Sequence, residues 1–376
     1  MIKLLHTADL HLDAPFPSLD EKESLRRNDF LLTFERLLTL AIKNEVDLFL
    51  VAGDLFDSPR PSAAVVGKVQ AGLKRLSDRG IVPVLLPGTH DSTVAADSVY
   101  RRTEFPGAVV LDAAVVDEPV SLSVGGRQVY LYGFAYRSFA SEDALSGMVR
   151  RSAEGIHIGM LHGSRQGSPE WEYRKKDLPF TLAQLKGWGL DYVALGHYHG
   201  FEVLEEDGRT YACYPGSPEG KRFGENGPRF CALVTLDADG AEVTRKTVNS
   251  RTLEERALDL SGCDGLESAS AAISALGGPD LLLRLTLTGI VEAPLDLDAL
   301  RARCGGDFFH LQFQDKTRLF DSDFARRIEG EETVRGVFVR RARRLMEEAP
   351  AEQKGLVEEA FREVLVRFGA FGGGVS

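Results

Sequence analysis

The segment at residues 46–57 reads Val-Asp-Leu-Phe-Leu-Val-Ala-Gly-Asp-Leu-Phe-Asp, an apolar run that ends in a glycine turn with two carboxylates. Its first part, residues 46–52, has the length and composition of a buried strand. Similar strands and amphipathic helices alternate with it along the first part of the chain. The strands are expected at residues 2–5 and 82–86, and the helices at 21–44 and 63–79. This alternation predicts right-handed crossovers and a largely parallel sheet.

After the third strand the apolar segments become shorter and are separated by hairpin-type turns. Gly125-Gly126, Asp207-Gly208 and Asp239-Gly240 each lie between strand-like segments. Dipeptides of this kind favour the tight turns that join antiparallel strands. We therefore expect a second, mostly antiparallel sheet that joins the first.

The pattern changes again near residue 250. Strand, helix, strand, helix and strand are expected in turn at residues 256–260, 265–276, 281–287, 296–303 and 309–313. This order is typical of a small separate α/β domain. Two amphipathic helices follow, at 331–346 and 351–368. The expected domains are therefore residues 1–250, 251–320 and 321–376.

The composition describes an ordinary soluble globular protein of two or three domains. The chain has 376 residues, 43% of them hydrophobic, and a net charge of −11 from 45 basic and 56 acidic residues. These values exclude a collagen, a disordered tail and a disulfide scaffold, and they leave no global basic surface for nucleic acid. A local basic face or bound metal ions would still attract a phosphate backbone.

The cysteines and the apolar segments bear on the compartment. The four cysteines form no Cys-x-x-Cys pair, which indicates neither a zinc site nor a redox motif and fits a reducing compartment. The first residues become polar at Asp9, too early for a signal peptide, and no apolar run is long enough for a membrane helix. A cytoplasmic location without membrane contact is expected.

Five short turns carry the residues that point to chemistry. Each follows an apolar strand and delivers a histidine or a carboxylate. They are Asp9-Leu10-His11, Gly53-Asp54-Leu55-Phe56-Asp57, Gly88-Thr89-His90-Asp91, Leu161-His162-Gly163 and Gly196-His197-Tyr198-His199. In an open α/β sheet the carboxyl ends of the strands converge on one crevice, so these side chains are expected to meet there.

Carboxylates crowded at one rim would repel one another and lose their solvation, and a cation resolves both problems. Mixed oxygen and imidazole ligands suit manganese, iron or zinc and argue against calcium. The ligands are too many for one tetrahedral ion but suffice for two ions that share a bridging carboxylate. Two such ions activate water and neutralise a phosphate oxygen, which suits phosphoester hydrolysis.

Each motif alone has an ordinary structural explanation. An Asp-x-His triplet is commonplace, and Gly-Asp-x-x-Asp alone is consistent with a capped turn. Of the remaining histidines, His157 is expected to be a strand residue, and His6 and His310 are expected to be packed or exposed rather than to bind metal. The order of the five turns, each at a strand end, is what favours a metal site.

This order of motifs resembles the calcineurin-like metallophosphoesterases, and the match spans about residues 1–220. Closer details are similar to the SbcD-type DNA repair nucleases. These details are HTADLHLD at 6–13, GDLFD at 53–57, LGHYH at 195–199 and YPGSPE at 214–219. The resemblance implies an α/β fold: a metallophosphoesterase two-sheet sandwich flanked by helices, followed by a small α/β capping domain and C-terminal helices.

The resemblance also implies roles for individual residues. Asp9, His11 and His199 would hold the first metal ion, Asp54 would bridge both ions, and His162 and His197 would hold the second. His90 would contact the scissile phosphate and help to protonate the leaving oxygen. Asp57 is expected to have at most an auxiliary role. Asp91 is expected to orient His90 or to cap the following helix.

Thr89 is the one departure from the family pattern. The family has an asparagine at this position, and its side-chain oxygen binds the second metal ion. A threonine hydroxyl is shorter and a poorer neutral ligand. We therefore keep Thr89 among the metal ligands but expect a weakened second site.

The function implied is that of a manganese-dependent DNA exonuclease and endonuclease, which acts in DNA end processing and repair with an SbcC-like coiled-coil ATPase. The family resemblance also suggests a homodimer. The helices at 331–346 and 351–368 match the family's partner-binding region in position, or they pack on the chain's own core. Two alternatives stay open: a general metallophosphoesterase that acts on small molecules or proteins, and a non-catalytic clamp for DNA ends.

Three local basic clusters are candidates for phosphate contact or are ordinary solvated surface. They are Arg101-Arg102, Arg174-Lys175-Lys176 and Lys221-Arg222.

Overall fold

The computed structural model describes residues 1–137, 142–174, 176–320 and 322–372. The chain forms two compact units, unit 1 (Met1–Thr252) and unit 2 (Leu253–Ser376). The further division expected at residue 320 remains a prediction. Each unit is described by itself.

The first sheet of unit 1 is parallel in its larger part, as the alternation of strands and helices predicts. Its strand order is β12-β11-β1-β2-β3-β4. Strands β1 to β4 run parallel, whereas β11 and β12 add antiparallel strands at one edge. Their bounds are β1 (Ile2–Thr7), β2 (Leu48–Ala52), β3 (Val82–Leu86), β4 (Val109–Val110), β11 (Phe230–Leu236) and β12 (Ala241–Thr247).

The second sheet of unit 1 has the order β5-β6-β7-β8-β10-β9. Its strands are β5 (Val120–Val124), β6 (Arg127–Gly133), β7 (Ile156–His162), β8 (Tyr192–Gly196), β9 (Glu202–Glu206) and β10 (Arg209–Tyr214). Strands β6, β7, β8 and β10 are parallel, and only β5 and β9 at the edges are antiparallel.

The prediction of a mostly antiparallel second sheet is therefore wrong. Two of the predicted hairpins lie at its edges, because Gly125-Gly126 joins β5 to β6 and Asp207-Gly208 joins β9 to β10. The third, Asp239-Gly240, joins β11 to β12 in the first sheet. A hairpin turn determines only the pair of strands that it connects, whereas the order in the middle of a sheet depends on contacts between distant segments.

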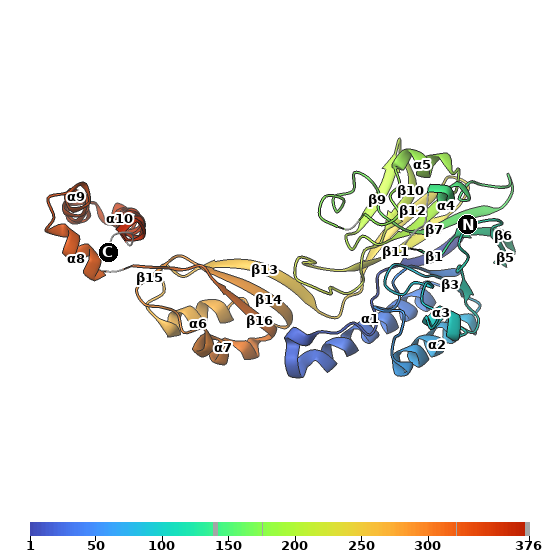
Figure 1. Ribbon diagram of the computed structural model, residues 1–376, viewed down its shortest axis with the longest axis horizontal. Coiled ribbons are helices and arrows are strands. Elements are labelled where there is room, and N and C mark those ends of the chain that lie inside the picture. The colour runs from blue at the N-terminus through green and yellow to red at the C-terminus, as the bar shows by residue number, and fades with distance from the viewer. Residues whose placement is uncertain (138–141, 175, 321, 373–376) are drawn as a thin grey trace. The chain divides into compact units, whose positions relative to one another are not determined.

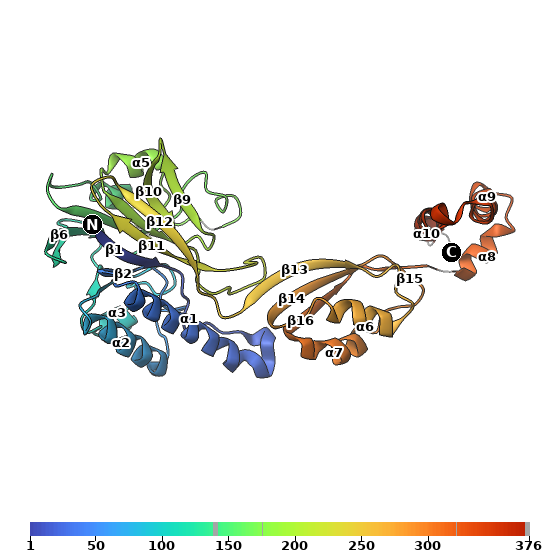
Figure 2. The ribbon, with the colours of Figure 1, turned by 180° about the vertical axis from the view of Figure 1, so that it is seen from behind.

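The two sheets pack face to face, and their inner faces form the main core of unit 1. Leu4, Leu50 and Val84 of the first sheet belong to the same buried cluster as Leu131 and Ile158 of the second. Figures 1 and 2 show helices α1 (Glu23–Lys43) and α2 (Ala63–Ser77) on the outer side of the first sheet. Short helices complete the unit: a 3-10 helix at Pro17–Lys22, α3 (Val99–Arg102), α4 (Glu142–Ser146) and α5 (Leu182–Gly187).

Unit 2 begins with a three-stranded sheet in the order β13-β14-β16, with β14 parallel to β16. The expected strand–helix–strand–helix–strand pattern is confirmed. Its elements are β13 (Thr252–Asp259), α6 (Leu266–Ser274), β14 (Gly278–Thr288), α7 (Leu297–Cys304) and β16 (Phe308–Asp315). A 3-10 helix at Gly305–Asp307 and the short parallel pair β15 (Ile290–Val291) and β17 (Arg318–Leu319) extend it.

Three helices end the chain: α8 (Ser322–Glu329), α9 (Val334–Glu348) and α10 (Ala351–Gly372). The sequence predicted the last two and missed α8, which is short. Ile328, Val339 and Phe361 belong to a small core that these helices share with one another. In the part of the chain that the structure describes, no helix is both long enough and apolar enough to span a bilayer.

Candidate metal centre

The five turns that the sequence singled out meet at the carboxyl ends of the strands of both sheets. Backbone hydrogen bonds tie the first two turns together: the amide of Asp9 donates to Gly53 at 3.0 Å, and the amide of His11 donates to Asp54 at 3.0 Å. The fifth turn joins them, because the amide of His197 donates to Oδ2 of Asp9 at 3.0 Å. Four of the five turns, all but the one with His162, line one open pocket of about 450 Å³.

The backbone at this centre adopts conformations that most residues avoid. Asp9, His11, Asp54 and His197 have positive φ angles of 52°, 46°, 50° and 101°. Left-handed backbone at non-glycine residues costs energy and is concentrated at functional sites. At Gly196 a Cβ atom would lie 1.9 Å from the carbonyl oxygen of Ala52, so only glycine fits there.

Three groups of side chains bring their ligand atoms within 4.8 Å of one another. The first holds Asp9, His11 and His199, and the second holds Asp9, Asp54 and His162. Their members are five of the seven residues that the sequence assigned to the two metal ions, and Thr89 and His197 are in neither group. The third group, with His11, Asp57 and His90, includes a carboxylate that the sequence gave only an auxiliary role.

Three histidines of the centre present the same ring nitrogen to it. The Nδ1 of His162 donates to the carbonyl oxygen of Ala52 at 3.0 Å. The Nδ1 of His199 lies 2.7 Å from Glu225, and that of His11 lies 3.0 Å from Asp57. The acceptors therefore hold a proton of His162 and of His199 on Nδ1, and Nε2 of each of the three rings lies within 4.0 Å of Asp9 or Asp54. Histidines that bind metal are held by an acceptor on their other ring nitrogen in this way.

Asp54 lies between the first two groups. Its Oδ2 is 3.4 Å from Nε2 of His162 and 3.9 Å from Nε2 of His11. Although burial raises the pKa of Asp54, the positive charge of His162 outweighs it and holds the pKa well below its usual range. A buried, ionised carboxylate between two sets of imidazoles has the geometry of a bridging ligand.

The pKa values of Asp9 and His162 show that positive charge stabilises the buried carboxylates of the centre. Burial raises the pKa of Asp9 to about 8, against the opposing charge of His162. Burial alone would lower the pKa of His162, but the charge of Asp54 raises it to about 10. In the metal-free state these buried groups therefore keep protons. Divalent ions would take the place of these protons, so the residues fit a metal centre.

Thr89 points into the same region as His162. Its Oγ1 donates to Oδ2 of Asp54 at 3.2 Å and lies 3.5 Å from Nε2 of His162. His197 is beside them, with its ring centre 5.3 Å from that of His162, although it is in none of the three groups.

His90 has the most exposed ring of the centre, with 45% of its side chain accessible. Its backbone amide donates to Oδ1 of Asp54 at 2.8 Å, and its Nδ1 donates to the carbonyl oxygen of Asp57 at 3.2 Å. The ring stands edge-on to that of His11, with 4.6 Å between centroids. Its Nε2 is thus the atom that can exchange a proton with a bound ligand.

Asp91 does not do what the sequence predicted. It is fully buried and accepts from the backbone amides of Gly88 and Phe56, at 2.7 and 3.1 Å, and from the hydroxyl of Tyr100 at 3.0 Å. It therefore ties the second and third turns together rather than orienting His90 or capping a helix. His6, expected to be packed or exposed rather than to bind metal, is buried, and His157 is a buried residue of strand β7, as expected of a strand residue.

The sequence missed four buried charged residues around the centre. Glu170 accepts from the backbone amide of His199 at 3.3 Å, and Glu225 lies against the ring of the same histidine. Arg26 donates to Glu219 at 2.8 Å and so anchors the loop that carries Glu225. No spacing in the sequence relates these residues to the turns, because the three glutamates lie in irregular loops and Arg26 lies on α1.

Basic side chains form one wall of the pocket. Arg174, Lys221 and Arg222 line it together with the exposed ring of Tyr173. Each basic residue is paired with an acid: Arg174 with Glu170, Lys221 with Asp57, and Arg222 with Glu225. Of the expected clusters, Lys221-Arg222 is therefore at the site. Lys175 lies outside the described residues, and Arg101-Arg102 is in α3 and does not line this pocket.

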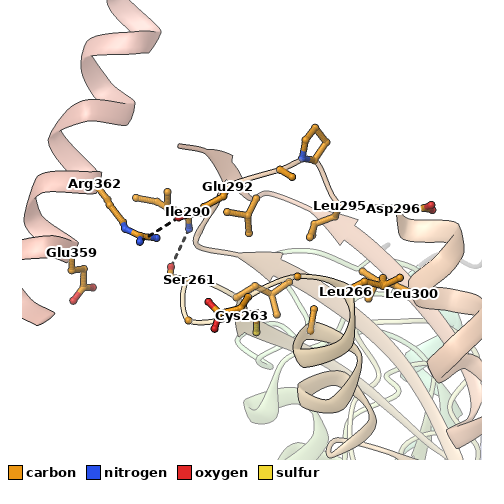
Figure 3. Close-up of a pocket in the computed structure, with 18 of the residues that line it drawn as sticks. Ser261, Cys263, Leu266, Ile290, Glu292, Leu295, Asp296, Leu300, Glu359 and Arg362 are labelled. Atoms are coloured by element: carbon orange, nitrogen blue, oxygen red, sulfur yellow. Dashed lines mark hydrogen bonds and ion pairs between the residues drawn. The ribbon is translucent and has the colours of Figure 1, made fainter. Parts of the chain in front are cut away.

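A larger cavity of about 710 Å³ lies in unit 2 (Figure 3). Its walls come from the loops after β13 and β15 and from α6, α7 and α10. Arg362 of α10 pairs there with Glu292 at 3.5 Å, and the hydroxyl of Ser261 accepts from the amide of Ile290 at 3.0 Å. None of its described lining residues is a histidine, and it holds none of the three candidate ligand groups.

Comparisons with known proteins bear on the centre directly. The family model described as calcineurin-like phosphoesterase matches residues 2–201, more than half of the chain. An uncharacterized metallophosphoesterase, YhaO of Bacillus subtilis, is 28% identical over 312 residues, which cover 78% of this chain and 74% of that protein.

Two archaeal proteins named DNA double-strand break repair protein Mre11 are also similar. The one from Haloferax volcanii is 28% identical over 293 residues, which cover 77% of this chain and 62% of that protein. The one from Methanosarcina mazei is 28% identical over 259 residues, which cover 66% of this chain and 39% of that protein. The chain thus spans less than two thirds of either archaeal relative.

The family match, the two-sheet fold and the clustered candidate ligands agree with one another. They identify a metal-dependent phosphoester hydrolase with a dinuclear site of divalent ions. The chain belongs to the calcineurin-like phosphoesterase family.

Proposed function

We propose that the chain is a DNA nuclease that depends on two divalent metal ions and hydrolyses phosphodiester bonds at DNA ends. The observation that carries the proposal is the set of Nε2 atoms of His11, His162 and His199, which face the buried carboxylates of Asp9 and Asp54 beside a basic pocket wall. The similarity to the Mre11 proteins supports DNA as the substrate.

We assign the residues to the two ions as the sequence predicts. Asp9, His11 and His199 would hold the first ion, Asp54 would bridge, and His162, His197 and Thr89 would hold the second. Manganese is the metal expected first, because the ligands mix carboxylates and imidazoles. Bound ions would supply positive charge that activates water and neutralises the phosphate.

His90 supplies the proton that the leaving oxygen needs. Its Nδ1 is held by the carbonyl oxygen of Asp57, so its exposed Nε2 is the atom that faces a substrate. A histidine positioned in this way is a general acid when Nε2 is protonated. Lys221 and Arg222 lie on the same pocket and would meet phosphates next to the scissile one.

The C-terminal helices support an SbcC-like ATPase as the partner. They build their own small core, while Val334 and Leu356 leave 85% and 69% of their surface exposed. An amphipathic helix with such a face can dock into a coiled coil. Deletion of residues 325–376 should abolish co-purification with the ATPase and leave metal binding by unit 1 intact. Homodimerisation and a cytoplasmic location belong to the same proposal.

The test is cleavage of end-labelled linear duplex DNA by the purified full chain with Mn²⁺. His90→Ala should lose cleavage but keep its metal ions, since its Nε2 is in neither of the first two ligand groups. Asp54→Asn should lose both the cleavage of DNA and the metal ions. Cyclic nucleotides and phosphopeptides are assayed in parallel.

The other outcomes separate the alternatives. Turnover of the small substrates without cleavage of DNA would favour a general metallophosphoesterase. Binding to DNA ends with or without Mn²⁺, and no hydrolysis of any substrate, would favour the non-catalytic clamp.

A further inference from the structure

Glu225 is a buried carboxylate in the loop between β10 and β11, and it touches the ring of a candidate metal ligand. Its Oε1 lies 2.7 Å from Nδ1 of His199, and only 4% of its side chain is exposed. Its Oε2 accepts from the backbone amide of Lys221 at 2.7 Å. Arg174 and Arg222 each place a guanidinium nitrogen 3.3 Å from Oε1.

This contact determines which nitrogen of His199 faces the centre. A carboxylate can only accept a hydrogen bond, so the ring proton is on Nδ1. Nε2 then has the lone pair, and it lies 4.0 Å from Oδ1 of Asp9 and 3.4 Å from Nε2 of His11. Without Glu225 the ring could keep its proton on Nε2, which would block that lone pair, or it could rotate.

The loop around Glu225 is built to keep the carboxylate in place. The backbone amide of Lys221 closes the turn at residues 221–225 by donating to Glu225. Glu219, two residues before this turn, is hydrogen-bonded to Arg26 of α1. A buried carboxylate would be costly without partners, and here every oxygen has one. The position is therefore rigid, as the support of a metal ligand must be.

We infer that Glu225 is a positioning residue of the first metal site, which holds the imidazole of His199 with its proton on Nδ1 and its Nε2 turned toward Asp9 and His11. The inference rests on the proposed function, because it concerns the same site.

Glu170 offers a matched control. It is buried beside the same histidine and also pairs with Arg174, at 2.8 Å. It contacts the backbone amides of His199 and Gly200 rather than the ring. If any buried carboxylate near His199 were enough to support metal binding, replacement of either glutamate would weaken the affinity for Mn²⁺ equally.

The experiment measures binding of Mn²⁺ to the full chain by calorimetry in a His162→Ala background, where only the first site remains. Glu225→Ala should weaken the affinity by about 10- to 100-fold and Glu225→Gln by about tenfold, since removing such a support typically costs this much. Glu170→Gln should stay within about threefold. Thermal unfolding is followed for every variant, and Glu225→Gln, which keeps the shape of the side chain, decides the matter if Glu225→Ala does not fold.

A second readout needs no metal. Long-range ¹H–¹⁵N spectra of the metal-free chain with native His162 should place the proton of His199 on Nδ1, and Glu225→Gln should move part of the population to Nε2. The signal is assigned by its loss in His199→Gln.

Equal effects of Glu225→Gln and Glu170→Gln, or an unchanged tautomer together with unchanged affinity, would overturn the inference. If the His162→Ala parent binds no Mn²⁺, the proposed function fails instead, and the tautomer spectra alone decide whether Glu225 orients the ring.

Discussion

The hydroxyl of Thr89 donates a hydrogen bond to Oδ2 of Asp54 at 3.2 Å. Thr89 therefore reaches the oxygen that lies nearest to His162, in the position where the family has an asparagine amide. A neutral hydroxyl gives less electron density to a cation than a carbonyl oxygen does. We therefore expect Thr89 to be a weaker ligand of the second ion than an asparagine would be.

Thr89→Asn is expected to tighten the second site. The amide oxygen reaches further and is the better neutral ligand, so the second dissociation constant for Mn²⁺ should fall by about tenfold, or about 1.4 kcal/mol. Calorimetric titration of the full chain measures it, with Thr93→Asn, a buried threonine outside the ligand groups, as a comparison. Unchanged occupancy of the second site would contradict the expectation.

Lys221→Gln is expected to affect polymeric substrates selectively. The Nζ of Lys221 is paired with Asp57 and only partly exposed on the pocket wall, where it can meet a phosphate next to the scissile one. The KM for an oligonucleotide should rise several-fold and its salt dependence should decrease, because one phosphate contact is lost. Hydrolysis of bis(4-nitrophenyl) phosphate should not change.

The control for that variant is Lys68→Gln, which removes an exposed lysine of α2 with the same change in net charge. Equal effects of the two lysine variants would mean that Lys221 acts only through the overall charge.

Gly196→Ala is expected to destabilise unit 1 and the centre together. Its Cβ would lie 1.9 Å from the carbonyl oxygen of Ala52 and 2.9 Å from Nδ1 of His162, so the strands must separate. Overpacking of this kind costs about 1–3 kcal/mol in the free energy of unfolding, which urea titration measures. Gly67→Ala in α2, where a Cβ meets nothing within 4 Å, should be neutral or slightly stabilising. An unchanged free energy of unfolding in Gly196→Ala would show that the two strands can move apart without loss of stability.

The free energy of unfolding of the metal-free chain is expected to decrease as the pH is lowered, and His6 is expected to be one cause. Burial lowers the pKa of His6 to about 3, and the ring is held neutral between the hydroxyl of Tyr192 at 2.9 Å and the carbonyl oxygen of Leu195 at 3.1 Å. The unfolded chain takes up this proton near the ordinary pKa of 6.5, so the contribution is complete above that pH and is lost as the pH falls toward 3.

His6→Gln removes this titration. The free energy of unfolding is measured by urea titration. Below about pH 6 it should decrease by about 1.4 kcal/mol more per pH unit in the native chain than in the variant. Parallel curves for the two proteins between pH 5 and 7.5 would exclude His6 as a source of acid sensitivity.

Much of the local structure could be predicted from the sequence. The apolar runs before the five turns are strands, the amphipathic segments at 21–44 and 63–79 are helices, and the alternating pattern after residue 250 is a small α/β unit. These features depend on neighbouring residues only, since side chains alternate along a strand and repeat along a helix. The residues that carry the candidate chemistry were found for the same reason: each lies at the end of its own strand or within a few residues of that end.

Tertiary structure decided what depends on distant segments. Strand β10 pairs with β8 in parallel although a hairpin joins it to β9, and no local signal indicates this. Likewise, Glu225 meets His199 and Asp91 joins the turns at Phe56 and Gly88 only after the chain has folded. The sequence by itself determined which residue types stand at the strand ends, because that follows from local periodicity. Only the packing of two sheets and their loops decided which carboxylate supports which histidine, because such contacts join residues that the chain order leaves far apart.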